Sequence, residues 1–350
     1  MNTERNYGID LLRLVLMYMV CVLHTLGQGG ILEASTSGSI DNKVFWLLEI
    51  LSYCAVDGFV LISGYMANSK PRKYEKLVEM WFQIFFYSFI ISLILTIIGI
   101  NKSWGTLDII KSALPVIARQ YWFFTAYFCL FLATPLLNKF LFSIEEEAAK
   151  KFFIISIVLF SIVGVMADPF VTNRGYTTIW ILVLYCIGVC AKRIHLFETR
   201  KSITLIILWG LCILCTWIVH AWVGNERLTT YTSPTILFSA IIMVILFSRL
   251  KLKGTIISKL SPLAFGIYLL QNNAVIWENI LKDAFVFVVN NPLPIAVGLA
   301  FILALAIFVS GLIVDFLRSI LAKVIRIPLI SKKIILICDA ILGKISTLLK

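Results

Sequence analysis

Ten apolar segments, each of a length suited to crossing a lipid bilayer, follow one another along this chain. A membrane-spanning helix needs roughly 20 mostly apolar residues. Hydrophobic residues make up 60% of the sequence and charged residues only 14%, a balance far from that of a soluble domain. The pattern predicts an all-α, polytopic integral membrane protein with about ten transmembrane helices around a polar cavity. The predicted spans are residues 7–28, 44–66, 78–100, 118–138, 152–170, 177–192, 203–223, 235–250, 262–281 and 293–317.

The distribution of basic residues predicts the orientation of these spans. With the N-terminus in the cytoplasm, most of the 31 lysines and arginines fall in cytoplasmic connections, as the positive-inside rule requires. The outer loops then hold only Lys43, Lys102, Lys111, Arg119, Arg174, Arg227 and Lys282. We therefore predict a multi-pass protein of the cell membrane with both termini in the cytoplasm. The net charge of +12 is explained by this topology, and no nucleic-acid partner is predicted.

Arg13 and His24 lie eleven residues apart in the first apolar segment. At about 100° per residue, eleven steps make about three helical turns, so both side chains lie on one face of the helix. Arginine and histidine are expensive inside a membrane, at roughly 2–3 kcal/mol or more each, and they normally face a protein or water-filled interior. Asp10, Met17 and Cys21 lie on or near the same face. This face is predicted to form one wall of a polar cavity.

Several classes of function find no support in the sequence. The eight cysteines all lie in apolar stretches without the spacing of a disulfide framework or a zinc site, and the three histidines are scattered. No metal site is therefore predicted. There is no Walker loop and no dinucleotide-binding glycine pattern, which argues against an ATP-driven pump.

Short motifs along the chain resemble those of acyltransferase family 3, whose members are integral membrane enzymes that acylate sugars and cell-surface polymers. An R-x4-D-x2-R pattern followed by ten residues and a histidine is filled by Arg5, Asp10, Arg13 and His24. Residues 56–65 (VDGFVLISGY) resemble the second-helix segment of the family. Later matches are YWFFTAY at 121–127 with TPL at 134–136, and FGIYLL at 265–270. The resemblance covers about residues 1–318. It departs at Gln271, where the family often has a histidine.

The resemblance implies transfer of an acyl group, we expect acetyl, from cytosolic acyl-CoA to a hydroxyl of an envelope glycan or lipid-linked sugar outside. Acetyl-CoA is then the donor substrate and no metal is required. Arg13 lies about one turn inside the cytoplasmic face, and His24 lies about 16 Å further along the helix axis. His24 is the natural general base for the acceptor hydroxyl because its ordinary pKa is near operating pH. Arg13 suits a polar part of the donor, or a carboxylate partner such as Asp10 or Asp57.

Other polar residues are candidates for supporting roles, each with a structural alternative. Glu49, at the predicted depth of His24, is the candidate for orienting its ring, and Asp57 lies nearer the depth of Arg13. Either acid equally suits an ion pair that fixes helix packing. Arg72, Lys73 and Lys76 are candidates for binding the CoA phosphates, although topology alone also explains them. Candidates for contact with substrate are Trp122, Tyr127, Gln271 and Glu278, for which interfacial or packing roles are the alternative.

The predicted organisation is one membrane acyltransferase domain at 1–318 and a tail at 319–350. In the tail, lysines interrupt apolar residues at helical spacing, which predicts a basic amphipathic helix on the cytoplasmic membrane surface. A secondary transporter or flippase, or a small-molecule importer with an acyltransferase-like fold, remains the alternative to an O-acyltransferase. The sequence leaves the acceptor and the oligomeric state open.

Overall fold

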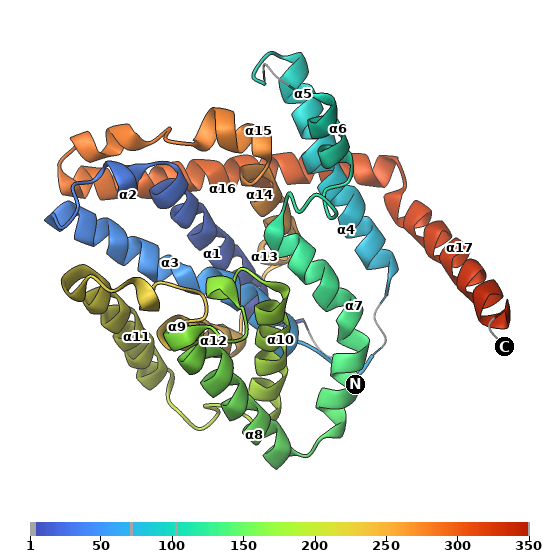
Figure 1. Ribbon diagram of the computed structural model, residues 1–350, viewed down its shortest axis with the longest axis horizontal. Helices are drawn as coiled ribbons and strands as arrows, with labels where there is room; N and C mark the ends of the chain where they lie inside the picture. Colours follow the sequence, from blue (N-terminus) through green and yellow to red (C-terminus); the bar gives the residue numbers. More distant parts are fainter. Residues whose placement is uncertain (1–4, 71–72, 102–103, 349–350) are drawn as a thin grey trace.

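The computed structural model describes residues 5–70, 73–101 and 104–348, and this part of the chain is built from helices (Figure 1). Within the described residues, seven helices are long and apolar enough to cross a membrane. This confirms the prediction of an all-helical, polytopic membrane protein. The seven run over Tyr7–Gln28, Ile40–Tyr65, Glu75–Ile97, Trp122–Ser143, Glu146–Ala167, Ser202–Val223 and Leu293–Val324.

The three other predicted spans form shorter helices. Two of them, α10 (Thr178–Arg193) and α12 (Pro234–Ser248), have 16 and 15 residues and bury most of their side chains among neighbouring helices. The third is broken: α14 (Ala264–Gln271) ends before Asn273, whose side chain accepts from the amides at the start of α15 (Ala274–Ile276). The other end of that side chain donates to the Tyr87 carbonyl and the Ser92 hydroxyl, so the break is buried and satisfied inside the protein.

The centre of the bundle is α3 (Ile40–Tyr65), which packs against α1 (Tyr7–Leu23), α10 and α12. The backbones of α3 and α10 approach each other closely. A Cβ on Gly64 would lie 2.2 Å from the Tyr185 carbonyl oxygen, and one on Gly188 would lie 2.6 Å from that of Leu61. Small residues are required here because the two backbones are in contact. This contact holds α3 in place, and α3 forms one wall of the site described below.

The outer helices cover this centre. They are α7 (Trp122–Ser143), α8 (Glu146–Ile157) with α9 (Val163–Ala167), and α11 (Ser202–Val223). Many of their aliphatic side chains are exposed, as suits helices that face lipid. The third long span is built from α4 (Glu75–Phe85) and α5 (Ser92–Ile97), joined through Phe86–Ile91. Short helices α2 (Ile31–Ala34), α6 (Thr106–Ala113) and α13 (Thr255–Leu260) lie in the connections.

A buried carboxylate fastens α4 to α16 (Leu293–Val324). Asp315 is fully buried and accepts hydrogen bonds from Gln83 and Tyr87, both at 3.0 Å, and from Arg318 on its own helix. Gly266 of α14 leaves room for it, since a Cβ there would lie 2.2 Å from the Asp315 carboxyl carbon. Both carboxylate oxygens therefore accept hydrogen bonds, and Asp315 joins α4 to α16 beside α14.

The tail forms α17 (Ile327–Leu348), which turns away from the end of α16 and lies beside α4 at the edge of the molecule (Figure 1). The predicted boundary at 318/319 falls inside α16, which continues without interruption to Val324. The structure thus has a separate helix in the tail, whereas its role as a basic amphipathic helix on the cytoplasmic membrane surface stays a prediction.

Candidate active site

Arg13 and His24 line the same cavity, which has a volume of about 820 Å³. Its walls come from α1, α3, α7 and α14, with the break after α14 closing one side. Met17, one turn from Arg13 on the same helical face, also lines it, while Cys21 is fully buried beside it. The cavity is mainly aromatic and aliphatic with a few polar groups, which is the usual character of a small-molecule site.

His24 is the first residue of a π-helical turn, His24–Gln28, which directly follows α1. Such turns are rare and occur often at functional sites. Gly29 and Gly30 follow it, and a Cβ on Gly29 would lie 2.3 Å from the Phe285 ring. The imidazole packs edge-on against Trp277, with ring centres 6.0 Å apart. Its Nδ1 has no hydrogen-bonding partner among the described residues, so one ring nitrogen is left for a substrate or an orienting group.

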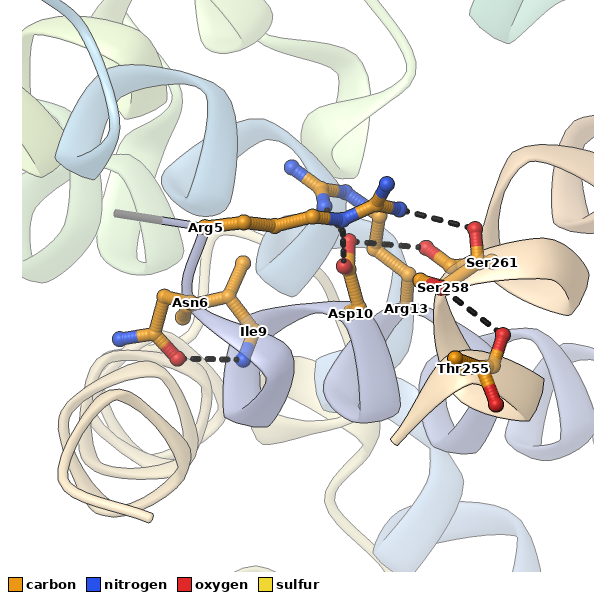
Figure 2. A network of polar contacts seen from close by, with 8 residues as sticks. All are labelled: Arg5, Asn6, Ile9, Asp10, Arg13, Thr255, Ser258 and Ser261. Carbon is orange, nitrogen blue, oxygen red and sulfur yellow. Dashed lines mark hydrogen bonds and ion pairs between the residues drawn. The ribbon is translucent and has the colours of Figure 1, made fainter. Parts of the chain in front are cut away.

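Arg13 is held by Asp10, which is nearly buried (Figure 2). The Asp10 carboxylate accepts from Arg13 Nη1 at 2.8 Å, from Arg5 Nε at 2.5 Å and from the Ser261 hydroxyl at 3.2 Å. Arg5 also donates to the Ser258 carbonyl, which ties the start of α1 to α13. Of the two partners that the sequence suggested for Arg13, the structure therefore pairs it with Asp10. The Arg13 side chain remains about one third exposed and lines the cavity.

A second cavity of about 500 Å³ adjoins the first. Four residues line both cavities, which places the junction at Arg13, Ser63, Met80 and Tyr127. Ser63 and Tyr127 bring their hydroxyl groups within 3.2 Å of each other there. Three lysines line the second cavity but not the first: Lys70, Lys73 and Lys76. Arg72, the other basic candidate, lies outside the described residues.

The three acidic candidates occupy different surroundings. Glu49 lines the main cavity and is buried, and its Oε2 has no hydrogen-bonding partner in the described part of the chain. Asp57 is fully buried behind the cavity wall, where its Oδ1 accepts from Trp180 Nε1 at 3.0 Å. Glu278 lies at the exposed rim of the cavity and pairs with Lys282 at 3.5 Å. Only Glu49 of the three combines burial with a place on the cavity.

The remaining sequence candidates are also near the cavity. Trp122 and Tyr127 line it. Gln271 is buried against α1, where its Nε2 lies 3.9 Å from the Met17 sulfur and its side chain lies close enough to the His24 ring to interact with it. The amide thus occupies the place beside the imidazole, and its Oε1 has no hydrogen-bonding partner among the residues described.

The cavity residues that the sequence analysis did not single out include three tyrosines: Tyr53, Tyr176 and Tyr231. Tyr53 follows Glu49 by one helical turn, a spacing that could have identified it. Tyr176 and Tyr231 come from separate loops, and no sequence spacing links them. Burial raises the pKa of Tyr231 well above the ordinary value for tyrosine, so its hydroxyl stays protonated and can donate or accept a hydrogen bond.

No group of three or more His, Cys, Asp or Glu side chains suited to a metal ion occurs within the described residues. A family model described as an acyltransferase domain matches residues 6–311. The match includes Arg13, His24 and every other described residue that lines the two cavities. Searches of the curated proteins and of the solved structures found no significant match.

Proposed function

This multi-pass membrane protein belongs to acyltransferase family 3, and from that premise we propose that it moves an acetyl group from cytosolic acetyl-CoA to a hydroxyl on the outer side of the cell membrane. The acceptor that we propose is an envelope glycan or its lipid-linked precursor. The observation that carries this proposal is the pair of adjoining cavities. Lysines line one end, Arg13 lies at the junction and His24 lies in the other chamber.

The arrangement suits a long donor that enters from one side. The CoA phosphates would lie near Lys70, Lys73 and Lys76, because anionic phosphate is attracted to ammonium groups. The pantetheine arm would pass Arg13 and bring its thioester towards His24, about 16 Å along the axis of α1. The acceptor would approach from the opposite end of the main cavity. Neither substrate then has to cross the membrane completely.

In the transfer step, a neutral ring nitrogen of His24 accepts the proton of the acceptor hydroxyl. At the same time, the oxygen of that hydroxyl attacks the thioester carbonyl carbon. The new C–O bond forms, the C–S bond breaks, and the proton returns to the sulfur, so that free CoA leaves as a thiol. Glu49 shares the cavity with His24 and is our candidate for orienting either the imidazole or the acceptor.

The decisive test of this function is acetyl transfer by the purified protein. In lipid nanodiscs with radiolabelled acetyl-CoA and isolated envelope material, we expect label to enter the glycan and free thiol to appear in equal amount. Deletion of the gene should lower envelope O-acetyl content. Transport of a solute into proteoliposomes without consumption of acetyl-CoA would instead favour the transporter alternative.

The proposed direction of transfer requires the lysine-lined cavity to face the cytoplasm, as it does in the predicted orientation with both chain ends cytoplasmic. In intact cells, a membrane-impermeant maleimide should label Ser37→Cys, in the exposed connection between α2 and α3, and should not label Lys73→Cys. Both variants should label after permeabilisation. The wild-type protein measures background from its native cysteines. The reverse labelling pattern would overturn the orientation and with it the cytosolic donor.

The lysines of the second cavity should act on the nucleotide part of the donor. The double change Lys73→Gln with Lys76→Gln should raise the KM for acetyl-CoA roughly five- to thirty-fold, since each exposed charge contact contributes up to about 1 kcal/mol. The KM for S-acetylpantetheine, which lacks the nucleotide, should be unchanged. Lys251→Gln with Lys253→Gln, in an exposed connection, is the matched control. An equal effect on both donors would mean that these lysines do not contact the nucleotide.

A further inference from the structure

Four aromatic side chains gather at one end of the main cavity, and we call them the aromatic mouth: Tyr53, Trp122, Tyr176 and Tyr231. The Trp122 ring lies 4.8 Å from that of Tyr176 and 6.4 Å from that of Tyr231, centre to centre. Tyr231 lies 5.1 Å from Tyr176 and 5.7 Å from Tyr53. Tyr176 is 47% exposed whereas Tyr231 is 6% exposed, so the cluster runs from the surface into the cavity.

A hydrogen-bond acceptor, Glu49, lies beside the aromatic mouth. Glu49 precedes Tyr53 by one turn of α3 and lies close enough to interact with both Tyr53 and Tyr231. Its carboxylate is buried with one oxygen unpaired in the described structure. Arg174, a cation close enough to interact with Tyr53, is paired with Glu226 at 3.7 Å. This end of the cavity therefore combines aromatic faces with an acid, in contrast to the basic end beyond Arg13.

The loop that carries Tyr176 is held in an unusual backbone conformation. Asp168, Val171, Asn173 and Arg174 all have φ between 41° and 58°, values that residues other than glycine seldom adopt. The Asp168 carboxylate stabilises this loop by accepting from the Thr172 amide and hydroxyl and from the Asn173 amide, at 2.6 to 2.8 Å. Backbone strain of this kind persists where the surroundings enforce it, and it clusters at binding sites.

The same loop is hydrogen-bonded to the segment that carries Tyr231 and packs closely against it. The Tyr231 amide donates to the Arg174 carbonyl at 3.1 Å. Gly175 has a φ of 101°, and a Cβ there would lie 2.5 Å from the Tyr231 Cβ. Trp180, in the first turn of α10, is fixed by its bond to the buried Asp57. Two loops distant in sequence thus present their tyrosines as one rigid surface opposite Trp122.

Resting on the proposed function, we propose that the aromatic mouth is the acceptor subsite and that it stacks on one face of a pyranose ring. The C–H bonds on one face of a pyranose carry partial positive charge, which complements the negative face of an aromatic ring. The hydroxyl groups at its edge need polar partners, which Glu49 and the tyrosine hydroxyls supply. An acyl chain would leave the buried Glu49 carboxylate without a partner, a costly arrangement. A ring held here has a continuous path through the cavity to His24.

The subsite is tested by binding, separately from catalysis. The probes are methyl glucopyranoside and methyl N-acetylglucosaminide, observed by saturation-transfer NMR with the full-length protein in nanodiscs. We expect Tyr176→Ala and Trp122→Ala to raise the glycoside Kd and the acceptor KM at least ten-fold. Tyr176→Phe and Trp122→Phe, which keep the ring face, should lie within about three-fold of wild type. Acetyl-CoA binding should be unchanged in all four variants. Trp222→Ala, an exposed tryptophan outside both cavities, is the matched control.

Different results separate this inference from the proposed function. Glycoside binding that depends on the aromatic mouth, without any acetyl transfer by wild type, would support the subsite and reject acyl transfer. Transfer to envelope glycan with unchanged acceptor KM in the alanine variants would reject the subsite alone. Failure of wild type to bind either glycoside would also overturn it. Weaker binding of hexanoyl-CoA, but not of glycosides, in the alanine variants would assign the mouth to an acyl chain instead.

Discussion

His24→Gln should lower the rate of acetyl transfer by about 10²- to 10⁴-fold while the Kd for acetyl-CoA stays within about two-fold of wild type. Removal of a general base typically has an effect of this size. Glutamine can still donate and accept hydrogen bonds, but it cannot take up the proton of the acceptor hydroxyl. In the proposed complex, by contrast, the donor is held mainly through its phosphates and its contacts at Arg13. Single-turnover transfer and calorimetric binding of acetyl-CoA, on the same nanodisc preparation, measure the two quantities.

His220→Gln is the matched control for this change. His220 also lies near the end of an apolar helix and packs against an aromatic ring, Trp46, but it does not line either cavity. It should transfer acetyl at close to the wild-type rate. If His24→Gln also transfers at that rate, His24 has a packing or hydrogen-bonding role only. A parallel loss of acetyl-CoA binding and transfer would place His24 in the donor site, with the base elsewhere.

The predictable parts of the site are those whose residues lie on a single helix. Helical periodicity alone brings Arg13, Met17 and His24 to one face of α1, and the cost of burying charge in lipid predicts that this face borders a polar space. The same periodicity explains why Glu49 and Tyr53 share a wall. Hydropathy likewise predicts the long spans, because bilayer thickness fixes the required length.

Contacts between distant segments could not be predicted from local rules. The interruption at Asn273 depends on acceptors supplied by Tyr87 and Ser92, which hydropathy does not reveal. Similarly, Tyr176 meets Tyr231 only because Asp168 and Gly175 hold their loop in a left-handed backbone conformation. The sequence offered Asp57 as a possible partner of Arg13, but its side chain bonds to Trp180 and lies behind the cavity wall.

Arg13 pairs with Asp10 and also lies at the junction of the two cavities, and these two features can be tested separately. It neutralises the nearly buried Asp10, which Arg5 also contacts, and it presents the rest of its guanidinium at the junction of the two cavities. Arg5 shares the first role but lines neither cavity. A comparison of the two arginines therefore distinguishes support of α1 from contact with the donor.

Arg13→Ala should raise the Kd for acetyl-CoA about 10- to 100-fold, since a hydrogen bond to a charged group contributes about 1.5–3 kcal/mol. Arg13→Lys should recover only part of this loss, because lysine keeps the charge but not the planar fork. Arg5→Ala should leave the Kd near wild type, although it weakens the Asp10 network equally. Calorimetric binding, with expression and detergent stability measured alongside, checks these values. Normal acetyl-CoA binding by Arg13→Ala would reject its donor role. Equal losses in Arg5→Ala and Arg13→Ala would show that both act through Asp10, by fixing the start of α1 against α13.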